Sequence, residues 1–271
     1  MPTLRTPLCP AVDIEVPIVQ APVGSVSTPE LAAAVADAGG LGLLAMSWRD
    51  ADGIEASYRA ASDRTDGRVG VNVVLDGSTG ELPPEACLDA CLDAGADIVS
   101  LSFGDPVRYI DRIHDAGAMA LVTVGTVSEA RAAAAAGADG GWLGTRFVAT
   151  EESGAHEAYR ENVADAPASD TRRTEQFAVG WPDQPHRVLA DSGPDESASG
   201  PVAHTADGDP VEANEDIPPL EGMSGDVTAL PQYAGQSVGG VDAVEPAGDV
   251  VESLVAETVG ALDGAADAVV R

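Results

Sequence analysis

The stretch PIVQAPVGSVSTPELAAAVADAGGLGLLA, residues 17–45, determines the fold class of this chain. It holds two apolar runs that do not alternate with polar residues, and such runs are typical of parallel strands buried on both faces. Between them, Pro29 stands where a helix would begin and Gly39 where it would end. The stretch therefore predicts a strand–helix–strand unit with parallel strands.

The join between helix and second strand is repeated along the first half of the chain. The pattern of small residue, Ala, Gly and then an apolar run occurs in ADAGGLGLLAM (36–46), DAGADIVSLSF (93–103), DAGAMALVTVG (115–125) and AAGADGGWLGT (135–145). Each Gly ends an Ala-rich helical segment, where the backbone needs a positive φ. Together with 17–23 and 69–75, the pattern predicts six strands, at 17–23, 41–46, 69–75, 97–103, 119–125 and 139–144. We therefore expect an α/β protein with a parallel sheet.

The remainder of the chain has a different composition. Residues 166–220 are rich in Asp, Pro, Ser, Gly and Thr and contain only short β-like runs such as HRVLA (186–190). We expect an irregular extension there. The segment 250–270 has apolar residues at helical spacing, which predicts a closing amphipathic helix.

The charge balance excludes some classes of partner. The chain has 45 acidic and 14 basic residues, a net charge of −31, and every basic residue is Arg. Such a field repels nucleic acid and anionic membranes, so neither is an expected partner. A Lys-free acidic surface suits a salt-rich cytoplasm, where charge repulsion is screened; an acidic surface that serves a particular partner is the alternative.

Cysteine usage indicates a reducing cytoplasm, and hydropathy predicts that no segment spans a membrane. There are three Cys and no secretory leader pattern at the start of the chain. Cys87 and Cys91 lie four residues apart, without a further ligand at metal spacing, so we expect small buried thiols and no metal site. No apolar run is long enough to span a membrane.

The Gly/Ser turn after the first strand suits a phosphate or a flat polar ring, although an ordinary βα turn reads the same way. Residues 17–45 resemble the opening of the nitronate monooxygenase family, formerly called 2-nitropropane dioxygenases. The resemblance continues in order through VGVNVVL (69–75), TVGTVSEARAAAAAGAD (123–139), WLGTRFVATEES (142–153) and DIPPLEGMSGDVTALPQYAGQSVG (216–239).

This resemblance implies an FMN-dependent oxidoreductase on a TIM-type (β/α)8 barrel. It implies oxidation of alkyl nitronates with O2 to a carbonyl compound and nitrite, and it leaves room for a homo-oligomer. The implied organisation is an FMN-binding barrel at 1–165, an irregular extension closing over the site at 166–240, and a helix packing back on the barrel at 241–271.

The resemblance also implies site residues. The flavin ring would lie along the backbone of Ala21, Pro22 and Val23 and contact Asn72, whose alternative role is a satisfied structural amide. The turn that would hold the FMN phosphate comprises Trp142, Leu143, Gly144 and Thr145. Tyr233 would lie in the segment closing over the substrate, or else be a buried packing residue.

The chain departs from the family between the strands at 119–125 and 139–144. Family members have two further strands there, one ending in a QGxEAGGH motif with the catalytic His and one ending in AAGGI, which donates to the phosphate. Neither motif is present, so we expect an internal deletion of about two βα units, roughly 60 residues at about 250 per barrel. The prediction is an incomplete barrel of six strands without an assignable catalytic residue.

Two alternative functions stay open. One is a non-catalytic remnant without bound flavin, and the other is a flavin-dependent enzyme resembling enoyl reductases. The chain's histidines are expected to be surface or structural residues: His114, His156, His186 and His204.

Overall fold

The structure is a computed structural model that describes residues 4–77, 80–104, 106–122, 141–177, 179, 185–193 and 200–269. The chain forms two compact units. Unit 1 comprises residues 1–22, 29–143 and 246–271, and unit 2 comprises residues 23–28 and 144–245. The organisation expected from the sequence, 1–165, 166–240 and 241–271, stays a prediction.

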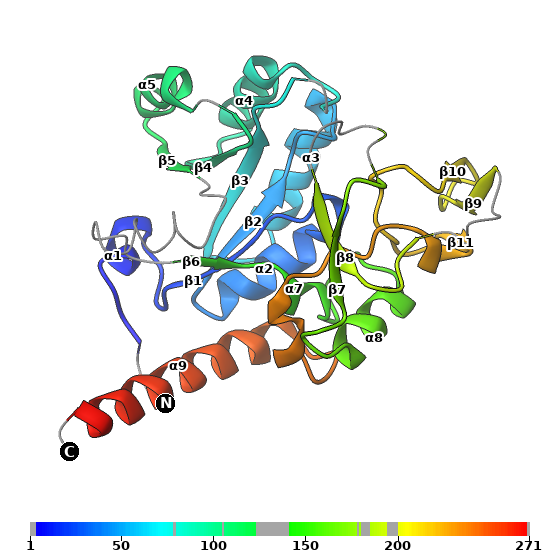
Figure 1. Cartoon of the computed structure of the whole chain (residues 1–271). Helices are drawn as coiled ribbons and strands as arrows, with labels where there is room; N and C mark the ends of the chain where they lie inside the picture. The colour runs from blue at the N-terminus through cyan, green and yellow to red at the C-terminus, as the bar shows by residue number, and fades with distance from the viewer. Residues whose placement is uncertain are drawn as a thin grey trace. The chain divides into compact units, whose positions relative to one another are not determined.

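Unit 1 is built on a six-stranded sheet in the order β5-β4-β3-β2-β1-β6, and all neighbouring strands are parallel (Figure 1). The strands are β1 Ile18–Gln20, β2 Leu41–Ala45, β3 Arg68–Val74, β4 Ile98–Ser102, β5 Met119–Val122 and β6 Gly141–Leu143. All six predicted strands are confirmed, and so is their parallel arrangement. They are buried as expected, since every residue of β1, β2 and β4 is buried.

Strand β6 pairs with β1, with Ile18 opposite Gly141 and Gln20 opposite Leu143. In a complete eight-stranded barrel the last strand closes on the first. Strand β6 therefore takes the place of the last strand, whereas β5 ends the sheet on its other side. Among the described residues no strand joins β5 to β6. The fold is an incomplete TIM-type barrel, as predicted. The helix and the junction expected between β5 and β6 lie outside the described residues.

Helices α1 Leu8–Val12, α2 Pro29–Asp37, α3 Ala51–Ser62, α4 Pro84–Asp93 and α5 Val107–Asp115 lie around the sheet, and α9 Ala247–Val269 contacts α2. Helix α2 begins at Pro29, as expected, and Gly39, Gly95 and Gly117 follow helices with φ of 83°, 95° and 78°. The closest helix–strand approach is at Gly42 of β2, where an added Cβ would lie 2.1 Å from the carbonyl oxygen of Ala32. Glycine at this position is what allows α2 to lie directly on β2.

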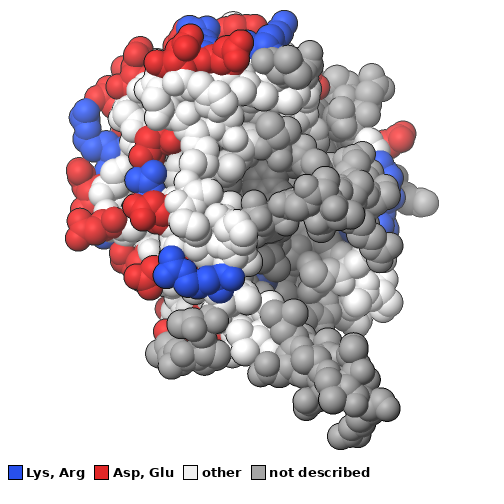
Figure 2. Space-filling model, turned by 90° about the vertical axis from the view of Figure 1, so that its left-hand side faces the viewer, with Lys and Arg blue, Asp and Glu red and all other residues white. Residues whose placement is uncertain are grey.

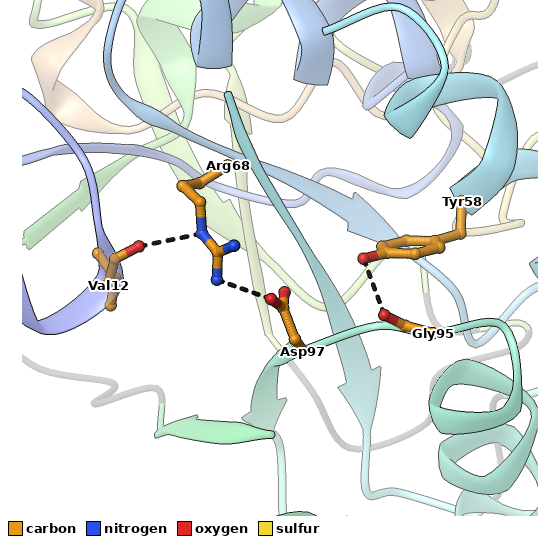
Figure 3. A network of polar contacts seen from close by, with 5 residues as sticks. All are labelled: Val12, Tyr58, Arg68, Gly95 and Asp97. Atoms are coloured by element: carbon orange, nitrogen blue, oxygen red, sulfur yellow. Dashed lines mark hydrogen bonds and ion pairs between the residues drawn. The ribbon is translucent and has the colours of Figure 1, made fainter. Parts of the chain in front are cut away.

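Polar contacts tie the amino-terminal ends of β3 and β4 to the surrounding helices (Figure 3). The Arg68 guanidinium donates to the Val12 carbonyl at 3.2 Å and to the Asp97 carboxylate at 2.8 Å. Tyr58 of α3 donates to the Gly95 carbonyl at 3.2 Å. Burial, and next the Asp97 charge, raise the pKa of the Tyr58 hydroxyl.

Unit 2 is more ordered than the sequence indicates. It contains helices α7 Thr145–Val148 and α8 Glu157–Asp165, a hairpin of β7 Thr171–Thr174 with β8 His186–Leu189, and a sheet of β9 Pro201–His204, β10 Pro210–Glu212 and β11 Ser224–Gly225. Three 3-10 turns lie at Gly24–Val26, Val227–Ala229 and Gln236–Gly240. The description of 166–220 as irregular was incomplete, because these strands are short and polar and lack an apolar pattern.

Acidic side chains gather on part of the described surface. Figure 2 shows one face on which red carboxylate side chains gather along one side, with blue side chains lying among them. Within unit 1, ion pairs join Arg59, Arg64, Arg68, Arg108 and Arg112 to Asp or Glu. Cys87 and Cys91 are buried thiols, as expected. In the described part of the chain, no helix has the length and hydropathy needed to cross a membrane.

Candidate functional site

A pocket of about 170 Å³ lies within unit 2. Its wall is formed by Val23, Gly144, Thr145, Val148, Arg187, Tyr233, Ala234 and Gly235. Four of these residues, Val23, Gly144, Thr145 and Tyr233, were predicted as flavin or substrate residues from separate parts of the sequence. The structure therefore brings together, in one cavity, predicted residues that are up to 210 positions apart in the chain.

Two hydroxyl groups position the pocket backbone. The Ser27 hydroxyl accepts a hydrogen bond from the Val23 amide at 2.8 Å, which fixes the turn that follows Pro22. The Thr145 hydroxyl accepts from the Gly235 amide at 2.9 Å and so ties α7 to the 233–235 segment. A hydroxyl that accepts one hydrogen bond keeps its own proton to donate. Thr145 can therefore donate to a group bound in the pocket.

Tyr233 is held in place by its neighbours. Its hydroxyl donates to the Asp216 carbonyl at 2.8 Å, and its carbonyl accepts from the Tyr159 hydroxyl at 2.6 Å. Its ring lies 5.3 Å from that of His186. Burial, and next the Asp216 charge, raise the pKa of the Tyr233 hydroxyl well above its ordinary value. Tyr233 therefore forms a neutral wall of the pocket.

Arg187, on β8, was missed by the sequence analysis. One terminal nitrogen of its guanidinium donates to the Thr171 hydroxyl at 3.1 Å. Among the described residues, no Asp or Glu carboxylate lies within the 4.0 Å of an ion pair from it. The available signal was a single Arg inside the short apolar run HRVLA. Without knowledge of the hairpin, that signal did not indicate where the side chain lies.

The remaining predicted flavin residues belong to unit 1. Ala21 and Pro22 directly follow β1, and Trp142 and Leu143 lie in β6, which pairs with β1. Parallel strands present their carboxyl ends at one edge, where the active sites of TIM barrels lie. The structure thus places these four residues on neighbouring strands at the expected edge.

Asn72 in β3 has its amide occupied within the sheet. Its nitrogen donates to the Ser100 carbonyl at 3.2 Å and lies 3.3 Å from the Ser100 hydroxyl, and its oxygen accepts from Ser102 at 3.2 Å. All three residues are buried. This arrangement corresponds to the alternative of a satisfied structural amide, and contact with a flavin would require Asn72 to exchange one of these bonds.

Other unusual residues lie at the carboxyl ends of unit 1 strands. Phe103, after β4, has a φ of 56° and is 50% exposed, although bulky residues seldom adopt positive φ. Arg49, after β2, has a buried Nε without a hydrogen-bond partner in the described structure, and burial lowers the pKa of its guanidinium. Strain and unpaired polar groups are concentrated at functional sites. Phe103 and Arg49 therefore make the carboxyl-terminal edge of the unit 1 sheet a candidate for a functional surface.

None of the four histidines lies in, or directly after, a described strand of unit 1. His114 lies in α5, His204 in β9, and the Nδ1 of His156 accepts from the Ala158 amide at 3.1 Å as the cap of α8. His186 lies in β8, where burial lowers the pKa of its imidazole. Across the described ranges there is also no group of three or more His, Cys, Asp or Glu side chains that could hold a metal ion.

Comparison with known proteins finds matches to parts of the chain. The nitronate monooxygenase family model matches residues 5–86. A nitronate monooxygenase of Paraburkholderia phytofirmans is 45% identical over 71 residues, which are 26% of this chain and 19% of that protein. The first part of the chain is thus similar to the nitronate monooxygenase family.

The similarity extends to other enzymes and to the whole fold. A (3aS,4S,5R,7aS)-5-hydroxy-7a-methyl-1-oxo-octahydro-1H-indene-4-carboxyl-CoA dehydrogenase of Mycobacterium tuberculosis is 34% identical over 137 residues, 50% of this chain. The match spans only 37% of the length of that relative. FabK from Thermotoga maritima aligns over 97% of this chain and 99% of its own, with a TM-score of 0.73 at 22% identity. This likeness supports the TIM-barrel fold.

Proposed function

We propose that the chain is a flavin-dependent oxidoreductase of the nitronate monooxygenase type, which binds FMN and takes an alkyl nitronate and O2 as its small-molecule substrates. The observation that carries the proposal is the pocket of unit 2. Val23, Gly144, Thr145 and Tyr233 were assigned from a family resemblance without structural knowledge, and all four line it. We place the FMN phosphate in this pocket.

The pocket is large enough for a phosphate group, and its polar side chains belong to Thr145, Arg187 and Tyr233. Its volume of about 170 Å³ exceeds the roughly 10–15 Å³ that one water needs but is below the roughly 300–1,000 Å³ of pockets that enclose a whole drug-sized ligand. Thr145 offers a hydroxyl donor, and Arg187 offers a guanidinium, which suits a phosphate dianion. Ala21 and Pro22 for the flavin ring, and Trp142 and Leu143 for the phosphate turn, stay residues that the family resemblance implies.

FMN, when bound, supplies the electron acceptor for the oxidation. The chain's own contribution is then binding and orientation: Thr145 fixes the phosphate, the backbone at 21–23 supports the ring, and Tyr233 walls the pocket as a neutral residue. A nitronate is already deprotonated at carbon, so its oxidation does not require a protein base. The lack of an assignable catalytic His therefore favours nitronates over neutral nitroalkanes as substrates.

We test this proposal by purifying the full chain in buffer with molar KCl, adding FMN, and removing free flavin. The expected result is a yellow protein with stoichiometric flavin absorbance. Propyl-2-nitronate should bleach that absorbance under anaerobic conditions and drive O2 uptake in air, while 2-nitropropane, the neutral form, should be at least tenfold slower.

Each alternative predicts a different outcome. A folded but colourless protein that does not take up FMN would support the non-catalytic remnant and refute the proposal. A yellow protein that is bleached by a nicotinamide, and not by the nitronate, would instead support an enzyme resembling enoyl reductases. We further propose that the protein works in a salt-rich cytoplasm and has no nucleic-acid or membrane partner. We propose that it forms a homo-oligomer, and light scattering of the purified protein in molar KCl tests this.

A further inference from the structure

Two aromatic side chains are exposed at the carboxyl-terminal edge of the unit 1 sheet. In the described chain, four large apolar side chains are exposed: Trp48, Phe103, Val179 and Val244. The two valines belong to unit 2, whereas Trp48 follows β2 and Phe103 follows β4 in unit 1. Active sites of TIM barrels lie at this edge of the sheet. The exposed Trp and Phe of the described chain thus lie where a substrate would bind.

The strand pairing places Trp48 and Phe103 at a similar level along the sheet. Strand β3 lies between β2 and β4, with Ala45 opposite Asn72 and Asn72 opposite Ser100 (Figure 1). Each aromatic residue lies three positions beyond its strand's member of this row. Neighbouring strands are about 4.8 Å apart, so the two backbones are roughly 10 Å apart. Aromatic rings pair with centroids about 4.5–7 Å apart, so one planar group could contact both side chains.

The turn that carries Trp48 is held by the neighbouring strand. The Met46 amide donates to the Asn72 carbonyl at 3.1 Å, and the Ser47 hydroxyl accepts from the Val74 amide at 2.8 Å. Both Met46 and Ser47 are buried. The Trp48 side chain therefore extends from a backbone that is already ordered, which lowers the entropic cost of binding a ligand.

Phe103 has a backbone conformation that needs a reason. In the described chain, Asp13 and Phe103 are the non-glycine residues with positive φ. Asp13 is the C-terminal cap of α1, a position where the left-handed conformation is common. Phe103 instead follows a strand, has a φ of 56° and is 50% exposed, although bulky residues seldom adopt positive φ. Such strain is concentrated at functional sites. It costs stability here without burying the ring, which indicates that the ring serves a ligand.

We propose that Trp48 and Phe103 bind an aromatic ring of the substrate, so that nitronates carrying an aryl group are preferred over small ones such as propyl-2-nitronate. The inference rests on the proposed function for the identity of the reacting group. Contact of a ring with both side chains would bury apolar surface and form aromatic pairs, whereas a small alkyl group can do little of either.

The kinetic test compares Trp48→Ala and Phe103→Ala with Val244→Ala, which shortens an exposed apolar side chain in unit 2. O2 uptake gives KM for propyl-2-nitronate and for the nitronate of phenylnitromethane. The first two variants should raise KM for the aryl nitronate roughly 5- to 20-fold, because a ring contact is lost. They should change KM for propyl-2-nitronate by less than about twofold, and Val244→Ala should change neither value by more than that. Trp48→Phe, which keeps a ring, should retain most of the aryl preference.

Phe103→Gly separates a binding role from a structural one. Glycine adopts positive φ without strain, so this variant should raise the melting temperature by about 2–4 °C while it raises KM for the aryl nitronate as Phe103→Ala does. A lower melting temperature with an unchanged aryl preference would indicate that Phe103 stabilises the fold, and it would overturn the inference.

Phenylacetate provides a readout that does not depend on flavin. Calorimetric titration of the flavin-free chain in molar KCl should detect binding of phenylacetate but not of propionate, and Trp48→Ala and Phe103→Ala should abolish it. If this pattern appears without any nitronate turnover, the proposed function fails while the aryl site stands. If both nitronates are oxidised and the two variants change their KM values equally or not at all, the inference is overturned while the proposed function stands. Loss of self-association in Trp48→Ala by light scattering, with an unchanged aryl KM, would also overturn it, since the surface would then be an interface between copies.

Discussion

Replacement of Gly42 by Ala tests the packing of α2 on β2. The added Cβ would lie 2.1 Å from the Ala32 carbonyl oxygen and 2.6 Å from the Ala32 Cα, both of them backbone atoms. An ordinary carbon–oxygen contact is about 3.3 Å, so the helix would have to retreat by about 1.2 Å. Buried α2 residues, including Leu31 and Val35, would lose contact with the sheet.

The expected cost is about 3 kcal/mol or more, at the upper end of the range for overpacking. For a chain of this size that corresponds to a fall in melting temperature of about 6–12 °C. Thermal and urea unfolding followed by circular dichroism measure both quantities. Gly260→Ala in α9 is the matched control, because its Cβ would meet no atom within 4 Å. That variant should gain about 0.5–1 kcal/mol from helix propensity. A Gly42→Ala protein within about 0.5 kcal/mol of wild type would refute the close approach of α2 and β2.

Three further predictions concern polar groups. Asp97→Asn should lower the free energy of unfolding by at most about 1 kcal/mol in dilute buffer and by less in molar KCl, because its pair with Arg68 is partly exposed; urea titrations at two salt concentrations check this. Burial raises the pKa of Tyr159 well above its ordinary value of 10.0, so above pH 10 only the unfolded chain loses this proton and stability falls. Unfolding measured on either side of pH 10 should show a smaller fall in Tyr159→Phe, and an equal fall would contradict the assignment. Thr145→Val should weaken FMN binding by about tenfold while Thr145→Ser retains it, since only the hydroxyl donates; equal affinities in fluorescence titrations would argue against the phosphate site.

The sheet could be predicted from the sequence because its signals are local. Non-alternating apolar runs and a Gly after each helix mark every strand of unit 1, and the structure has all six strands in the predicted places. These features depend on short stretches whose residues interact with the backbone nearby. The pairing of β6 with β1 was not predicted from the sequence and is known only from the structure.

Unit 2 could be predicted only in part because its order depends on distant contacts. Strand β7 has the sequence TRRT, which carries no apolar pattern, and it is defined by its pairing with β8. Arg187 gains its place in the pocket from that pairing. The flavin contact of Asn72 rested on the family resemblance and stays a prediction, and in the structure Ser100 and Ser102 on the neighbouring strand occupy its amide.

The β1–β6 pairing has a consequence for how the chain folds. Ile18 and Gly141 pair across 123 positions of sequence, whereas Leu41 and Arg68 of β2 and β3 pair across 27. Loop closure grows as three-halves of RT times the logarithm of length, so the β1–β6 closure costs roughly 1.3 kcal/mol more in chain entropy. Strands β1 to β5 can zip together neighbour by neighbour, but β6 must return to the start of the chain. We expect β6 to dock after the other strands have formed. Until then β1 is an unpaired edge strand of the sheet. It is therefore the strand at which a folding chain is most open to wrong pairing with another copy.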